Sequence, residues 1–172
     1  MNLWLRLLLL MLRLRRASPV DLLDELVLDL RVLPNDLDAF GHMNNGRYLT
    51  MMDLGRLALM ERTGLLKAAR RERWLPLVRG IEIEYFRPLM PWQKFRLYTR
   101  LISWDRKWVY LEQRFVAGET LHARAHIRGL LRAADGNVPT ATLLQAIGAA
   151  DLEPPEQPPE DVRDPGVQTT AV

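Results

Sequence analysis

Four consecutive segments with strand-like alternation follow a single long helical segment, and this order restricts the fold more than any other feature of the chain. Apolar and polar side chains alternate through residues 77–89, 94–104, 107–118 and 119–133, and short turn-forming links separate the segments. Strands joined by such short links pair antiparallel. The pattern predicts an α+β fold in which an antiparallel β-sheet is wrapped around a long central helix.

The predicted central helix covers residues 45–64. Asn44 or Asn45 is placed to cap its start, and Gly64 is placed to end it. Its apolar positions form more than a narrow stripe, which predicts that the surroundings bury most of the helix; they are Tyr48, Met51, Met52, Leu54, Ala58, Leu59 and Met60. A strand over 26–32 is predicted before it, and a short helix over 140–147 after the four strands.

The two ends differ from the domain predicted over residues 21–150. Residues 1–20 are apolar and basic, with four arginines and no acid in the first sixteen. Their longest uninterrupted apolar run, residues 7–12, is far shorter than the ~20 residues that span a bilayer. Residues 1–16 fit two interpretations: a position in a membrane interface, with arginines at the head groups, or docking on the body of the protein. Residues 151–172, rich in proline and acid, are expected to form a disordered tail.

Composition excludes several classes of function. The chain has no cysteine, which rules out disulfides, zinc-thiolate sites and a cysteine nucleophile and fits a cytoplasmic location. Arginine outnumbers lysine 21 to 3, but the formal net charge is only +3. The arginines are scattered and most are accompanied by acids, whereas nucleic-acid binding requires an uncompensated basic stripe. We therefore expect no nucleic-acid partner.

The segment DLDAFGHMNNGRY, residues 36–48, concentrates polar groups at the start of the predicted buried helix. Backbone N–H groups and the positive end of the helix dipole point outward there, so they can stabilise a developing oxyanion. A carboxylate beside them can attack a carbonyl or activate water. Because Asp, Asn and Gly are also common turn formers, a purely structural turn is the alternative interpretation.

No cofactor or metal is predicted. His122 and His126 have a spacing that would chelate a metal on a helix, but on a strand four residues span about 13 Å. The same strand places alternate side chains on one face, which we expect to be solvated: His122, Arg124, His126 and Arg128. The chain also lacks a nucleophilic serine elbow, a P-loop and a glycine-rich dinucleotide fingerprint.

The segment DLDAFGHMNNGRYLTMMDLGR, supported by IEIEYFRPL and KWVYLEQRF, resembles the hotdog-fold thioesterases. The resemblance is to the 4-hydroxybenzoyl-CoA thioesterase-like group, within it to the THEM6-like branch, and covers about residues 25–148. It implies a hotdog fold, hydrolysis of acyl-CoA or acyl carrier protein thioesters to free acid and thiol, and a homodimer or homotetramer with active sites between two subunits.

The resemblance also implies roles for individual residues. Asp38, the second acid of the D-x-D element, matches the family's catalytic carboxylate, and His42 is its expected partner. Related plant thioesterases carry an Asn two residues after this Asp, and the chain departs from that pattern at Phe40. The residues expected to bind substrate are Gly41, Asn44, Asn45 and Tyr48, with the acyl chain along Tyr48, Met51 and Met52. Two alternatives remain: a hotdog hydratase or dehydratase, and a non-catalytic acyl-thioester or lipid-binding protein at the membrane.

Overall fold

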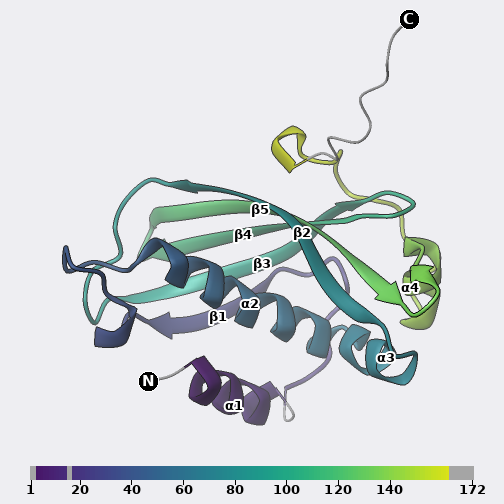
Figure 1. The fold of residues 1–172 in the computed structure, drawn as a ribbon, viewed down its shortest axis with the longest axis horizontal. Helices are drawn as coiled ribbons and strands as arrows, with labels where there is room; N and C mark the ends of the chain where they lie inside the picture. Colours follow the sequence, from purple (N-terminus) through teal and green to yellow (C-terminus); the bar gives the residue numbers. More distant parts are fainter. Residues whose placement is uncertain (1–2, 15–16, 163–172) are drawn as a thin grey trace, which may run out of the picture.

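An antiparallel sheet curls around one long helix in the computed structural model, which describes residues 3–14 and 17–162 (Figure 1). The main strands occur in the spatial order β1-β3-β4-β5-β2, and the short β6 pairs with β5. Their bounds are β1 (Leu26–Arg31), β2 (Leu75–Tyr85), β3 (Lys94–Trp104), β4 (Val109–Ala117), β5 (Thr120–Ala133) and β6 (Gly136–Asn137). The predicted α+β hotdog architecture is confirmed.

The central helix, α2 (Asn45–Arg62), begins at the predicted residue. Gly64 does not simply end it, because its left-handed backbone (φ 78°) redirects the chain into a second helix, α3 (Leu65–Arg71). The sequence analysis did not predict α3. After the strands, α4 (Thr140–Ala146) occupies most of the segment that we predicted as a short helix.

The core lies between α2 and the concave face of the sheet. Buried apolar side chains from the helix, the strands and the loops that precede α2 and β3 fill it, among them Met51, Met52, Phe95, Leu97 and Phe115. A buried polar contact ties the middle of the helix to the sheet: Gln113 on β4 donates to the Met52 carbonyl at 3.0 Å. Gly55 makes this close approach possible, because a Cβ there would lie 2.5 Å from the Gln113 amide nitrogen.

The N-terminal helix α1 (Leu3–Leu14) packs beside α2 and β1 (Figure 1). Arg6 and Leu14 are buried, and Leu7 and Leu10 pack against the main core. The helix α1 therefore docks on the body of the protein, which was one of the two interpretations of this segment. None of the helices within residues 3–14 and 17–162 combines the length and the apolar character needed to cross a bilayer.

The segment after α4 is ordered further than expected. We predicted disorder from Asp151 onward, but residues 151–162 run along the sheet and end in the 3-10 turn η2 (Glu160–Val162). Val162 is buried with Ile102, Trp108 and Tyr110, and the Glu156 carbonyl accepts a hydrogen bond from Ser103 at 2.7 Å. The prediction failed here because partners on the sheet, not local apolar content, hold the segment. Residues 163–172 lie outside the described part.

Candidate active site

The candidate catalytic turn, residues 36–44, begins at the last residue of the 3-10 turn η1 (Pro34–Asp36), ends where α2 starts, and is built by hydrogen bonds among its own residues. The Asp38 N–H donates to the His42 carbonyl at 2.9 Å, and the Gly41 N–H donates to the Asp38 carbonyl at 3.2 Å. Gly41 has φ 82°, a left-handed conformation that strains other residues. The glycine is therefore required by the turn itself, and no side chain obstructs approach to it.

Asp38 and His42 meet within this turn. Nδ1 of His42 lies 3.1 Å from Oδ2 of Asp38, and the other carboxylate oxygen accepts the Phe40 N–H at 2.8 Å. The Asp38 side chain is only 20% exposed, while His42 is more open. The carboxylate is thus held by two neighbours at the surface of the molecule. His42 is one of them, as the family resemblance implied.

Phe40, the residue at which the chain departs from the plant pattern, faces outward. Its ring is 86% exposed and stacks on His42, with 6.2 Å between the ring centroids. A largely exposed aromatic ring beside a polar site is the kind of surface that a partner or a ligand covers.

Asp36 has a different environment from Asp38. It is 1% exposed and forms a buried ion pair with Arg6 of α1. Its carboxylate also accepts the Leu33 N–H at 2.8 Å, and its carbonyl accepts the Asn44 N–H at 2.9 Å. Asp36 is therefore a structural residue of the turn. The sequence analysis missed its partner Arg6, which stands 30 residues earlier.

The helix α2 begins three residues after His42. The side chain of Asn44 caps the helix by accepting the Gly46 N–H at 2.8 Å, so the predicted cap is confirmed for Asn44. Asn45 is the exposed first residue of the helix, and its carbonyl accepts a hydrogen bond from the Tyr85 hydroxyl at 3.3 Å. The end of β2 therefore lies against the start of α2.

Tyr48 lies in the core, not beside the turn. It is 2% exposed, and its hydroxyl accepts the Leu89 N–H at 3.3 Å. Burial raises the pKa of this hydroxyl above its usual value. The acyl path that we predicted along Tyr48, Met51 and Met52 is occupied by packed side chains, since Met51 and Met52 are equally buried. The sequence pattern could not show which side of α2 faces the packed core.

An apolar cavity of about 330 Å³ lies further along α2. It is enclosed by one side of the helix and the inner face of the sheet, and its wall includes Leu57, Met60, Leu77, Val78 and Leu131. Asp53 and Arg56 contribute the polar part of its lining. Burial lowers the pKa of Arg56, which donates to the Gln113 side chain at 2.9 Å. The cavity is an apolar site with one polar wall, the usual composition of a small-molecule pocket.

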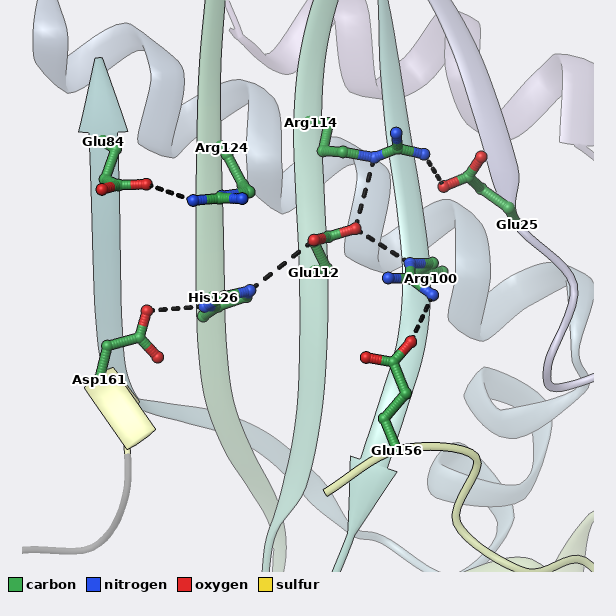
Figure 2. A network of polar contacts seen from close by, with 9 residues as sticks. All are labelled: Glu25, Glu84, Arg100, Glu112, Arg114, Arg124, His126, Glu156 and Asp161. Carbon is green, nitrogen blue, oxygen red and sulfur yellow. Dashed lines mark hydrogen bonds and ion pairs between the residues drawn. The ribbon is translucent and has the colours of Figure 1, made fainter. Parts of the chain in front are cut away.

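The opposite face of the sheet carries a network of charges (Figure 2). Glu112 lies at its centre, with Arg100 Nε at 2.9 Å and His126 Nε2 at 3.7 Å. Arg100 also binds Glu156 at 2.7 Å, and His126 binds Asp161 at 2.6 Å. We expected this face to be solvated, but the segment 151–162 covers part of it. No group of His, Asp and Glu side chains suited to a metal ion occurs within residues 3–14 and 17–162.

A sequence comparison decides the family. The model of the thioesterase-like superfamily matches residues 32–164. The chain belongs to this superfamily. It is also 39% identical over 155 residues to Protein THEM6 of Xenopus laevis, a match that covers 86% of this chain and 71% of the relative.

Solved structures agree with this membership. A probable thioesterase from Bartonella henselae is 25% identical, with a TM-score of 0.61 over 67% of this chain and 97% of that one. A gentisyl-coenzyme A thioesterase has the same fold at 18% identity, with a TM-score of 0.61 over 72% of this chain and 99% of that chain. Family and fold together support thioester hydrolysis as the activity of this superfamily member.

Proposed function

We propose that this protein hydrolyses acyl thioesters of coenzyme A or of acyl carrier protein, with Asp38 as the catalytic carboxylate. The observation that carries the proposal is the Asp38–His42 pair, 3.1 Å apart, held at the surface where the buried helix α2 begins. In a thioesterase-like protein, this location combines a carboxylate with the backbone donors of a helix start.

The proposed reaction uses the Asp38–His42 pair and a backbone donor at the start of α2. The N–H of Asn45 polarises the thioester carbonyl, since the Asn44 cap occupies the next donor, that of Gly46. Asp38 takes a proton from water as the water oxygen attacks the carbonyl carbon. The C–S bond then breaks, the thiolate leaves and takes up the proton, and the acyl group departs as the free acid. His42 holds the carboxylate in position.

A second role fits the same carboxylate. Asp38 can attack the carbonyl itself and form a mixed anhydride with release of thiolate, after which water cleaves the anhydride. The two routes differ in which molecule receives the oxygen atom of the attacking water. In a single turnover in H₂¹⁸O, direct attack by water labels only the acid product, whereas hydrolysis of the anhydride at the Asp38 carbonyl labels the protein.

The apolar cavity beside α2 is the proposed acyl site, in place of the packed Tyr48 region. It lies next to the first residues of β2, Pro76–Val78, whereas the catalytic turn lies near the end of the same strand, at Tyr85. In a single subunit, the turn and the cavity therefore lie at opposite ends of β2. Two copies paired antiparallel through β2 would bring the turn of one to the cavity of the other.

The free edge of β2 supports this homodimer. Within residues 3–14 and 17–162, β2 is the end strand of the sheet and pairs only with β5. Its exposed apolar side chains, with that of the adjacent Phe86, are those expected of a covered interface; they are Leu75, Val78, Tyr85 and Phe86. Exposed Arg87 lies in the segment that contacts the turn through Leu89 and Met43, and is a proposed contact for the phosphates of coenzyme A.

Thiol release from acyl-CoAs of graded chain length, including an aromatic acyl-CoA, tests the activity. Enoyl-CoA hydration is followed in parallel, because it would identify a hotdog hydratase. We expect hydrolysis of a subset of the acyl-CoAs and no hydration. Binding of acyl-CoA without turnover across the whole panel would instead identify a non-catalytic acyl-thioester carrier and contradict the proposal.

A further inference from the structure

The outward side of α1 is apolar. Five large apolar side chains of this helix are between 41% and 74% exposed: Trp4, Leu5, Leu8, Leu9 and Leu12. They recur at spacings of three and four residues, so they form one continuous ridge. A helix that is apolar on both its packed and its open side is ordinarily covered on both.

The ridge is held rigidly on the protein. On the inward side, the Arg6 guanidinium forms its ion pair with buried Asp36 and donates to the Met51 sulfur at 3.0 Å. Leu14 is buried at the end of the helix. Because these contacts fix the rotation of α1 about its axis, the leucines of the ridge cannot turn inward to join the core.

The groove beside the ridge is lined by more arginines than acids. This groove of about 410 Å³ separates α1 from β1 and has an apolar floor that includes Leu28 and Leu30. Its charged lining residues are one aspartate and four arginines: Asp29, Arg6, Arg13, Arg31 and Arg62. Arg13 and Arg31 are exposed, and the first acid of the chain is Asp21. Leucines flanked by arginines complement a surface that has an apolar interior and anionic head groups.

We propose that the ridge of α1 binds the surface of a bilayer that contains anionic phospholipid. The leucines and Trp4 enter the acyl boundary, and Arg13 and Arg31 contact lipid phosphates. The ion pair between Arg6 and Asp36 connects this surface directly to the base of the catalytic turn. The ridge lies beside β1, at the opposite end of the sheet from β2, so the membrane and the proposed dimer partner use separate surfaces.

Co-sedimentation of the full chain with sucrose-loaded vesicles tests this surface. The vesicles contain phosphatidylcholine alone or equal parts of phosphatidylcholine and phosphatidylglycerol. We expect binding to the anionic vesicles that weakens as salt is added. The double variant Leu8→Glu/Leu12→Glu should reduce the partition coefficient by at least about tenfold, since it removes two apolar side chains from the ridge. Leu152→Glu, at an exposed leucine outside α1, is the matched control and should bind as the unmodified protein does.

Trp4 supplies a second measurement that needs no charged variant. Vesicles with brominated acyl chains should quench part of the tryptophan emission of the unmodified protein, and Trp4→Phe should abolish that part. The proposal is overturned if the unmodified protein stays in the supernatant with anionic vesicles at low salt, or if Trp4→Phe leaves quenching unchanged. A mass in solution that falls in Leu8→Glu/Leu12→Glu without vesicle binding by the unmodified protein would assign the ridge to a second copy instead.

Discussion

Nδ1 of His42 lies 3.1 Å from Oδ2 of Asp38, and one short turn supplies both side chains. We expect His42→Gln to lower kcat by about a hundredfold and to change KM little, because the imidazole positions the carboxylate without carrying the acyl group. The measurement is steady-state thiol release. His126→Gln, on the far face of the sheet, is the control and should keep its kcat. Equal rates for His42→Gln and the unmodified protein would remove His42 from the mechanism.

The ion pair between Arg6 and Asp36 predicts a large effect on stability. Both side chains are buried, at 6% and 1% exposure. Arg6→Ala would leave the buried Asp36 carboxylate with Arg47 alone, whose Nε lies 3.6 Å from Oδ1, so we expect a loss of about 3 kcal/mol in the free energy of unfolding. Urea denaturation measures it. Arg13→Ala, on the exposed side of the same helix, should change the value by less than about 0.5 kcal/mol; comparable losses in the two variants would refute a specific role for the pair.

The network around Glu112 predicts a pH dependence of stability. The ion pair with His126, together with Arg100, lowers the pKa of Glu112 from 4.5 to about 2. The ion pair with Glu112, and then the hydrogen bond with Asp161, raises the pKa of His126 above 6.5. The contribution of Glu112 is complete above pH 4.5 and is lost as pH falls toward 2. That of His126 is complete below pH 6.5 and is lost as pH rises through its folded pKa.

Both contributions are therefore present together between pH 4.5 and 6.5. In this window we expect Glu112→Gln to lower the free energy of unfolding by about 2 kcal/mol, and the difference from the unmodified protein to shrink on acidification. Denaturation midpoints measured across the pH range provide the test. A loss that stays constant as pH falls to 2 would show that the ionised carboxylate is not what stabilises the sheet.

The free edge of β2 predicts dimerisation. Leu75→Lys/Val78→Lys places two charges at this edge, and we expect the mass by light scattering to fall to that of a monomer, with thiol release lost although Asp38 is intact. Val27→Lys makes the same kind of change on β1, the other end strand, and should leave the dimer unchanged. A fully active monomer would contradict a site shared between subunits.

Local patterns in the sequence predicted what local interactions determine. Alternation located the strands, and the cap residue Asn44 located the start of α2. The Asp38–His42 pair was predictable because four residues separate its members and a glycine turns the chain between them. The helix α3 was missed since its basic residues resembled a solvated connector, although leucine, alanine, lysine and arginine are good helix formers.

Contacts between distant segments could not be predicted in this way. Arg6 and Asp36 are 30 residues apart, and nothing in either neighbourhood identifies the other as its partner. The order of residues 151–162 likewise depends on Arg100 and His126 of the sheet. The family resemblance implied a substrate-binding role for Tyr48, but the sequence could not show that the rotation of α2 directs this side chain into the core.

The most direct test of the account is the ratio of kcat/KM for thiol release between Asp38→Asn and the unmodified protein, on the best acyl-CoA of the panel. Asp24→Asn, at an exposed aspartate in the loop before β1, is the matched control for the same chemical change. Because the amide can neither accept the proton nor attack the carbonyl, we expect a loss of about a thousandfold or more in Asp38→Asn and none of that size in Asp24→Asn. A folded Asp38→Asn variant that retains the kcat/KM of the unmodified protein would contradict the assignment of Asp38 as the catalytic carboxylate.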